Sequence, residues 1–325
     1  MIISLQKNIS SANRRDLLNA LSRLLPDCQP RRTSSGLALA ITNPEADAVP
    51  RIENLPGVTG VLLSNSELCP LACAGIKKSF STPLDFSRGP VFITGPCAVE
   101  DEKSYLASAL ALKAAGAHAL RAALFKPRSS PYAFQGIGWA GLKIIAKARK
   151  ITGLPLVTEA TDTRQVERLS AVCDILQIGA RNMRNYDLLK EAGRGGCATL
   201  LKRGMRATLR EWLLSAEYLL KHGAKKLILC ERGDSVFSSD NPGLDFRLMR
   251  EAKKLTGLPM LADPSHTSRN REIARKLALK ALHAGADGLL IEASVSPGAA
   301  GVDGRQTITI ETFRAITRGG RRNEA

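Results

Sequence analysis

Aromatic residues make up only 4% of this 325-residue sequence, and long apolar runs are absent from it. A helix needs about 20 mostly apolar residues to cross a bilayer, so the sequence predicts no membrane span. The opening stretch, MIISLQKNISSANRRD, also lacks the sustained apolar segment of a secretory signal peptide. We therefore expect a cytoplasmic protein with no membrane partner.

The scarcity of aromatic residues also bears on the net charge of +17. So basic a chain could bind nucleic acid, but the aromatic platforms on which bases stack are rare here. Helix-turn-helix, zinc-finger and RNA-binding motifs are missing as well. We therefore expect no nucleic-acid partner. The positive charge is assigned to solvated helix surfaces and to sites that face anionic substrates.

The seven cysteines do not form the even, regularly spaced set of a disulfide framework. Cys69 and Cys73 are close in sequence, but no histidine or second cysteine pair follows nearby, so no zinc site is expected there. A GxGxxG motif is also missing after the first strand of the long second part of the chain. This argues against a dinucleotide-binding fold.

Residues 1–75 alternate short strand and helix patterns. Strands are expected at 1–5, 36–42 and 58–64, and helices at 13–25 and 46–55. The order strand–helix–strand–helix–strand, with room for one more strand, predicts a small ferredoxin-like α+β domain. Residues 76–89, which include a proline, are expected to form a linker.

Residues 90–325 change to strands that alternate with longer helices. KARKITGLPLVTEA (147–160) resembles EAKKLTGLPMLADP (251–264), and in both a glycine is placed to end the helix. Eight strands are expected, at 91–94, 118–121, 155–159, 174–177, 198–202, 226–230, 259–262 and 288–291. Eight such units predict a (β/α)8 TIM barrel, and a doubly wound open sheet is the alternative.

The carboxyl ends of all eight expected strands carry charged or ligand-type side chains. In a TIM barrel these ends form the active-site face. Each residue alone has an ordinary structural explanation, such as a solvated arginine or a cysteine that fills the core. No such explanation accounts for their coincidence at eight strand ends, and this coincidence predicts a catalytic site.

One group of these strand-end residues is cationic. Its members are Arg121, Lys126, Arg128, Arg181, Lys202 and Arg232. Six cations at one mouth repel one another unless anions bind between them, and a phosphate monoester carries about −1.5 to −2 charges near neutral pH. Two phosphates and a carboxylate would balance the set, and arginine binds both kinds of group through paired hydrogen bonds.

A second group consists of metal-ligand residue types: Cys97, His266, Glu292 and Asp303. A thiolate, an imidazole and two carboxylates form a plausible four-ligand set for one divalent transition metal ion. The mixture of soft and hard donors does not choose among manganese, iron, cobalt and zinc.

The same residues lie in motifs that resemble one family. The motifs are GPCAVE (95–100), FKPRSSPYAFQG (125–136), VTEATD (157–162), DILQIGARNMRNYDLLKEAG (174–193), LLKRGM (200–205), ILCERG (228–233), DPSH (263–266) and GADGLLIE (285–292). They resemble type I 3-deoxy-D-arabino-heptulosonate 7-phosphate (DAHP) synthase, in the subgroup with an N-terminal ferredoxin-like regulatory domain. That family condenses phosphoenolpyruvate with erythrose 4-phosphate and water, in the first step of the shikimate pathway to chorismate and the aromatic amino acids.

The resemblance implies a role for each candidate residue. It assigns metal binding to Cys97, His266, Glu292 and Asp303, phosphoenolpyruvate to Arg121, Lys126, Arg181, Lys202 and Arg232, and the erythrose phosphate to Arg128 and Ser129, with Pro127 as a further substrate-binding residue. Glu159 matches a carboxylate near the attacking water, and the expected catalytic residues are Lys126, Glu159 and His266. The resemblance also implies a homo-oligomer, either a tetramer or a dimer, and an aromatic amino acid as a possible effector.

The chain departs from the family pattern at several positions. They are Ala122-Ala123 for Gly-Gly, Ser129 for Thr, the segments Thr267–Asn270 and Asp234–Asp240, and Ala293-Ser294 for Val-His. No expected metal ligand or substrate cation is lost. We therefore expect activity to be intact, while the preference for the aldose stays open.

Two other functions compete with this one. 3-Deoxy-D-manno-octulosonate 8-phosphate synthase uses the same chemistry on arabinose 5-phosphate, but that family carries Lys-Ala-Asn where this chain has KPRSSP (126–131). A non-catalytic amino-acid-sensing paralogue is the other, and the retention of all four metal ligands argues against it.

Overall fold

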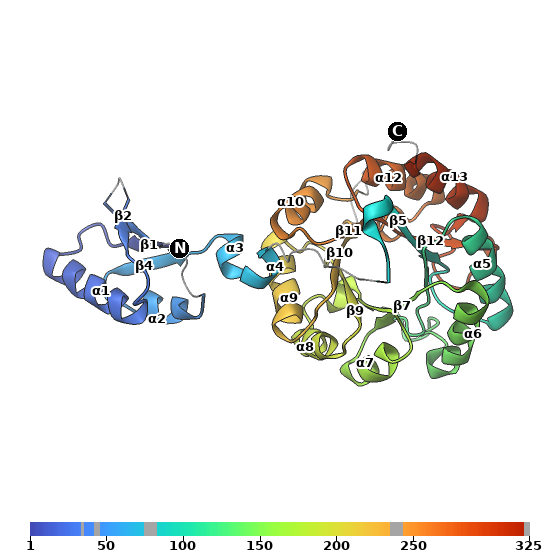
Figure 1. The fold of residues 1–325 in the computed structure, drawn as a ribbon, viewed down its shortest axis with the longest axis horizontal. Coiled ribbons are helices and arrows are strands. Elements are labelled where there is room, and N and C mark those ends of the chain that lie inside the picture. The colour runs from blue at the N-terminus through green and yellow to red at the C-terminus, as the bar shows by residue number, and fades with distance from the viewer. Residues whose placement is uncertain (34–35, 42–45, 75–82, 235–242, 322–325) are drawn as a thin grey trace. The chain divides into compact units, whose positions relative to one another are not determined.

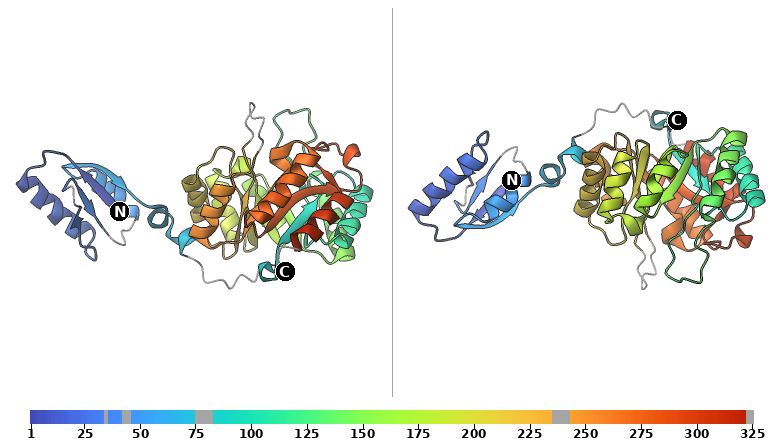
Figure 2. Two further views of the ribbon diagram at one scale, coloured as in Figure 1. Left: turned by 90° about the horizontal axis from the view of Figure 1, so that it is seen from above. Right: turned by 90° about the horizontal axis from the view of Figure 1, so that it is seen from below.

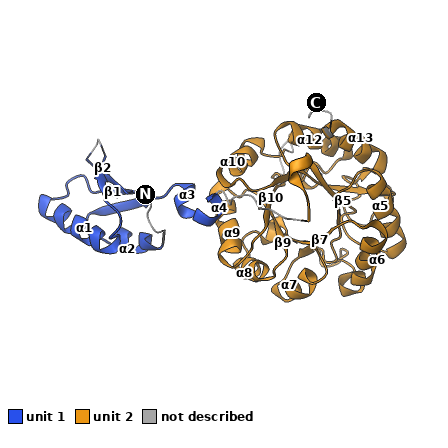
Figure 3. Cartoon of the chain, viewed as in Figure 1, with its two compact units in different colours: residues 1–74 blue, residues 75–325 orange. Residues whose placement is uncertain are grey.

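The structure is a computed structural model. It describes residues 1–33, 36–41, 46–74, 83–234 and 243–321. The chain divides into two compact units, Met1–Ala74 and Gly75–Ala325, coloured separately in Figure 3. The first half of the expected linker, residues 76–82, lies outside the described residues, and so do residues 235–240 of the expected departure at Asp234–Asp240.

The first unit contains an antiparallel sheet in the order β2-β3-β1-β4. Its strands are β1 (Ile2–Leu5), β2 (Arg31–Arg32), β3 (Ala38–Ala40) and β4 (Val58–Leu62), and its helices are α1 (Ser11–Leu24), α2 (Val49–Glu53), α3 (Asn65–Leu68) and α4 (Pro70–Cys73), with a 3-10 turn η1 (Ala46–Ala48). This strand order is that of a ferredoxin-like fold, which confirms the expectation. The fourth strand for which the sequence left room is β2.

Helix α1 begins two residues earlier than expected because Ser10 caps it. The Ser10 side chain accepts a hydrogen bond from the backbone N–H of Asn13 at 3.1 Å, which satisfies a donor of the first turn. The buried face of the helix carries Leu17 and Leu21, which share a core with Ile3 of β1. This core belongs to the first unit alone.

In the described part of the second unit, eight parallel strands close into a barrel (Figure 1). They are β5 (Val91–Gly95), β6 (Ala119–Arg121), β7 (Leu156–Ala160), β8 (Ile175–Ile178), β9 (Ala198–Lys202), β10 (Leu227–Glu231), β11 (Met260–Ala262) and β12 (Gly288–Ser294). The expected barrel is therefore confirmed. Each strand starts and ends within one residue of its expected bounds, except β12, which continues to Ser294 and there pairs with a short strand, β13 (Ile308–Thr309).

Helices surround the strands in the side views of Figure 2. They are α5 (Glu102–Ala114), α6 (Leu142–Thr152), α7 (Thr163–Ser170), α8 (Tyr186–Arg194), α9 (Leu209–Lys221), α10 (Phe246–Thr256), α12 (Arg271–His283) and α13 (Ile310–Arg321), with the short α11 (Ser265–Ser268) and 3-10 turns at Phe86–Arg88, Gly138–Gly141, Ala180–Asn182 and Pro297–Ala299. The repeated glycines that we expected to stop helices do so: Gly153 and Gly257 end α6 and α10 with left-handed φ angles of 69° and 63°.

The strands are buried on both faces, as parallel barrel strands must be. Ile93, Val157, Leu200, Ile228 and Leu290, from five different strands, share one apolar cluster inside the barrel. Polar side chains with a chemical function therefore find room only where the strands end. Among the described residues, no helix is both long and apolar enough to span a bilayer.

Candidate active site at the carboxyl ends of the barrel strands

A cavity of ≈ 380 Å³ opens where the strands of the barrel end. Its lining includes Lys126, Pro127, Arg128, Ser129, Glu159, Arg181, Lys202, Arg232, His266 and Asp303. Arg121, Cys97 and Glu292 are buried, with Arg121 at 3% exposure and Glu292 at 0%. The structure thus brings the expected site residues together around one cavity and the layer beneath it.

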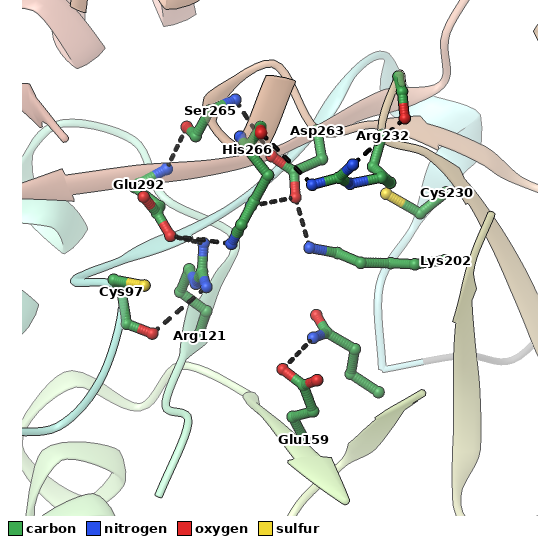
Figure 4. A network of polar contacts seen from close by, with 12 residues as sticks. Cys97, Arg121, Glu159, Lys202, Cys230, Arg232, Asp263, Ser265, His266 and Glu292 are labelled. Carbon is green, nitrogen blue, oxygen red and sulfur yellow. Dashed lines mark hydrogen bonds and ion pairs between the residues drawn. The ribbon is translucent and has the colours of Figure 1, made fainter. Parts of the chain in front are cut away.

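The four expected metal ligands form one cluster. One ligand atom from each of Cys97, His266, Glu292 and Asp303 lies within 4.8 Å of all the others. Cys97 follows β5, Glu292 belongs to β12, and Figure 4 shows the His266 ring directed toward Glu292. Cys97 and Glu292, nearly 200 positions apart in the sequence, meet here because β5 and β12 are neighbouring strands of the closed barrel.

Asp263 fixes the orientation of His266. The Nδ1 atom of His266 lies 2.6 Å from Asp263 Oδ2, and the other carboxylate oxygen accepts the backbone N–H groups of Ser265 and His266, each at 3.1 Å. When the neutral imidazole donates its Nδ1–H to Asp263, its Nε2 atom keeps a lone pair that can bind a metal ion. Burial lowers the pKa of His266, which favours this neutral form.

The environment of Glu292 fits a bound cation. Its Oε1 atom is buried, has no hydrogen-bond partner among the described residues, and lies 3.2 Å from His266 Nε2. It forms an ion pair with Arg121 at 3.1 Å, while Gln306 donates to Oε2 at 3.0 Å. Burial alone would raise the pKa of Glu292, but the positive charges of Arg121 and Lys126 help to outweigh it, and the pKa falls to about 2. An anionic oxygen therefore faces a lone pair, an arrangement that a divalent cation between them would stabilise.

Cys97 completes the cluster as a thiol. Its Sγ donates to Asp303 Oδ2 at 3.1 Å. Burial and the neighbouring Glu292 carboxylate raise the thiol's pKa well above its usual value, so without a cation the proton stays on sulfur. A metal ion in the cluster would take the place of this proton, because a coordinating thiol is deprotonated.

Five of the six expected cations line the same cavity, and several already contact oxygen atoms. Lys202 pairs with Asp263, and Lys126 Nζ donates to the carbonyl of Cys97 at 3.4 Å. Arg232 donates to the carbonyl of His266 at 3.3 Å, and Arg181 to that of Pro127. Burial lowers the pKa of Arg232, a sign that its charge is desolvated and suited to an anionic ligand.

Glu159 stands apart from the metal-ligand cluster and has its own support. Gln177 of β8 donates to Glu159 Oε2 at 2.8 Å. Gly179 makes room for the carboxylate, since a Cβ there would lie 2.0 Å from Glu159 Oε1. The carboxylate is therefore held in a set position at the cavity wall (Figure 4).

Sequence reasoning gave no role to Asp263, Gln177 or Gln306, although each orients an expected site residue. Gln177 carried a usable signal, because an amide in an otherwise apolar buried strand needs a hydrogen-bond partner. Asp263 carried another, because it directly follows the apolar strand β11. Gln306 lies in an irregular loop, and nothing in the sequence pattern marks it.

Comparison with known proteins places this site in a family. The model of the DAHP synthetase I family matches residues 87–322. The chain belongs to this family. The family match and the barrel confirm the expected DAHP synthase, an enzyme, at the level of the catalytic unit.

The chain is also similar to individual proteins of known sequence or structure. The chain is 39% identical to the phospho-2-dehydro-3-deoxyheptonate aldolase of Thermotoga maritima, over 69% of this chain and 67% of that one. The crystal structure of a DAHP synthase from the same organism superposes with a TM-score of 0.82 at 30% identity, covering 99% of this chain and 96% of that one. The 2-dehydro-3-deoxyphosphooctonate aldolase of Geobacter metallireducens is 31% identical over 76% of this chain and 94% of its own.

Two of the departures from the expected pattern lie in different surroundings. Ala122 and Ala123 are buried at 1% and 4% exposure, and the Ala122 carbonyl accepts a hydrogen bond from Thr158 at 2.8 Å. The segment Thr267–Asn270 instead lies beside the site. Arg269 of this segment lines a second cavity of ≈ 670 Å³, which shares His266 with the first.

Proposed function

We propose that this protein condenses phosphoenolpyruvate with erythrose 4-phosphate and water to give 3-deoxy-D-arabino-heptulosonate 7-phosphate and phosphate. The observation that carries the proposal is the shared cavity, in which a four-ligand cluster and a ring of cations meet. A condensation of two phosphorylated substrates needs both features: a metal ion in the four-ligand cluster would polarise the carbonyl, and the cations would bind the anionic groups.

Phosphoenolpyruvate takes the inner part of the cavity in this proposal. The cations assigned to it are Arg121, Lys126, Arg181, Lys202 and Arg232. Arg121, Lys126, Lys202 and Arg232 are all less than 9% exposed, so their charges act where water screens them little. Its phosphate and carboxylate would replace carbonyl oxygens as partners of Lys126 and Arg232.

Erythrose 4-phosphate takes the outer part. Arg128 is half-buried and Ser129 exposed, on the loop that follows β6, and both line the cavity. A guanidinium and a hydroxyl side by side suit a terminal phosphate. With the phosphate held there, the aldehyde would extend inward toward His266 and Asp303.

The residues then divide the chemistry. One divalent metal ion held by Cys97, His266, Glu292 and Asp303 would supply Lewis acidity at the aldehyde oxygen. Carbon 3 of phosphoenolpyruvate bonds to the aldehyde carbon, and positive charge develops at carbon 2. Glu159 orients the water that adds to carbon 2, Lys126 donates a proton toward the developing alkoxide, and phosphate leaves.

The metal ion is manganese, iron, cobalt or zinc in this proposal, since the donor set is compatible with each. Elemental analysis of the purified protein identifies it. A Cys97→Ser variant should retain much less metal than the unchanged protein.

A second candidate substrate is arabinose 5-phosphate, because the 2-dehydro-3-deoxyphosphooctonate aldolases also resemble this chain. Arg128 and the DAHP synthetase I family match favour the shorter sugar. The test is the stoichiometry of the reaction: one phosphate should be released for each phosphoenolpyruvate consumed, and only when erythrose 4-phosphate is present.

We also propose that residues 1–75, which include the whole first unit, regulate the barrel by binding an aromatic amino acid. Every residue assigned to the chemistry lies at or after Cys97, so this unit adds nothing to the reaction itself. A ferredoxin-like sheet offers edges where a small effector can bind. We further propose that the protein forms a homo-oligomer, either a dimer or a tetramer. Its location is cytoplasmic in this proposal, because both substrates are intermediates of central metabolism.

A further inference from the structure

Asp303 differs from the other three residues of the metal-ligand cluster in how its backbone is held. Cys97, His266 and Glu292 lie in or directly after regular elements, whereas Asp303 lies in the long loop between β12 and β13. Its φ of 55° is a left-handed conformation that is unfavourable for a residue with a side chain. Such a conformation persists only where the surrounding structure enforces it.

Glu100 provides that enforcement on one side of the loop. Its Oε2 atom accepts the backbone N–H of Gly301 at 3.0 Å, and its Oε1 atom accepts that of Val302 at 3.1 Å. A Cβ at Gly301 would lie 3.2 Å from Oε2, so the carboxylate sits directly against the backbone. Both oxygens of Glu100 therefore bind the two residues that precede Asp303.

Arg271 holds the other side of the same loop. It donates to the carbonyls of Gly304 at 2.8 Å and Thr307 at 2.7 Å. Glu100 and Arg271 together fasten the loop before and after Asp303. Glu100 has one further property: it follows Cys97 by three residues, in the loop after β5. It thus joins the loop of one ligand to the loop of another.

We propose that Glu100 is a positioning residue for metal binding, which acts by holding Asp303 in the left-handed conformation that points its carboxylate at Cys97 and His266. The proposal rests on the metal site of the proposed function and adds a residue outside the ligand cluster to it. Glu100 is not itself a ligand, because backbone N–H groups occupy both of its oxygens.

Glu100→Gln is the direct test. The variant keeps one acceptor oxygen and turns an amide N–H₂ toward a backbone N–H, so one of the two hydrogen bonds is replaced by repulsion. Residues that orient metal ligands typically contribute about 10- to 100-fold to metal affinity. We expect a loss of this size in the affinity of the full-length apo protein for Co²⁺, measured from the thiolate-to-cobalt absorption band.

Glu102→Gln is the matched control. Glu102 lies two residues further on, is exposed, and pairs with Lys147 on the protein surface. The same chemical change there should leave the Co²⁺ affinity unaltered. Thermal unfolding of the apo proteins checks folding, and Glu100→Asp, which keeps the charge but shortens the side chain, serves as a second variant with the same expected direction.

The double variant Glu100→Gln/Asp303→Ala separates positioning from general weakening. If Glu100 acts through Asp303, its replacement should have no further effect once the Asp303 carboxylate is gone. The proposal is overturned if Glu100→Gln binds Co²⁺ as tightly as the unchanged protein. It is also overturned if Glu100→Gln lowers the Co²⁺ affinity by the same factor whether or not the Asp303 carboxylate is present. Failure of the metal site itself would show differently, as a cobalt band that is missing from the unchanged protein or that survives in Cys97→Ser.

Discussion

At the scale of single residues, Asp263 connects the two halves of the site. One carboxylate orients His266 of the metal-ligand cluster and pairs with Lys202 of the cation group. These contacts hold the pKa of Asp263 well below its usual range despite its burial, because the hydrogen bond from His266 and the positive charges of Lys202 and Arg121 favour the anion. A single buried anion thus positions His266 against Lys202.

Arg128 binds the phosphate of the aldose in the proposed function. Arg128→Ala should raise the KM for erythrose 4-phosphate by about 10- to 100-fold, the value of a charged hydrogen bond to a phosphate, and leave the KM for phosphoenolpyruvate nearly unchanged. Steady-state kinetics with each substrate varied in turn measures both. Arg184→Ala, which removes a surface arginine that pairs with Glu211, is the control. Equal effects on the two KM values would remove Arg128 from this role.

Cys97 acts as a metal ligand and not as a nucleophile in this account. The raised pKa of its thiol leaves little thiolate near neutral pH unless a metal ion is bound. A chelator should therefore abolish activity, and a divalent metal ion should restore it. Full activity in protein shown by elemental analysis to be metal-free would contradict the assignment of all four ligands.

At the scale of elements, the closure of the barrel depends on Gly288 at the start of β12. A Cβ there would lie 2.0 Å from the carbonyl oxygen of Val91 on β5, which is its closing partner. Gly288→Ala should destabilise the protein by more than about 3 kcal/mol, in the range of severe backbone clashes. The melting temperature measures the loss.

Gly153→Ala is the matched control for this prediction. Gly153 also has a positive φ, but its Cβ position is open, so only the left-handed strain of about 1 kcal/mol applies. A smaller loss of melting temperature in Gly288→Ala than in Gly153→Ala would show that the β5–β12 contact is not tight.

The sequence also predicted the positions of the barrel strands well. Strands such as β9 and β10 are buried on both faces, so they appear as short apolar runs between glycines and charged residues, and their bounds follow closely. The two-residue strand β2 was not placed, because it exists only through its pairing with β3. The supports Gln177 and Glu100 were missed for a related reason: their roles depend on contacts between loops and strands distant in sequence.

At the scale of the whole molecule, the first unit should be separable from the chemistry. A chain that begins near Asp85 should keep DAHP synthase activity, because every residue assigned to the chemistry lies at or after Cys97. The full-length protein should be inhibited by tyrosine, phenylalanine or tryptophan, and the shortened one should not, because an effector acts only through the unit that binds it. If the full-length protein ignores all three amino acids at about millimolar concentration, a range that covers even weak sites, this regulation is wrong.

The central claim is the reaction itself, and the consumption of phosphoenolpyruvate with different aldoses tests it most directly. The metal-loaded protein would be supplied with erythrose 4-phosphate, with arabinose 5-phosphate, or with no aldose, and kcat/KM compared. We predict rapid consumption of phosphoenolpyruvate with erythrose 4-phosphate, with DAHP as the product, and no consumption without an aldose. With arabinose 5-phosphate, consumption should be at least about tenfold slower, because one misplaced contact to a phosphate lowers kcat/KM by at least that factor. Equal or faster consumption with arabinose 5-phosphate, or no consumption with either sugar, would contradict it.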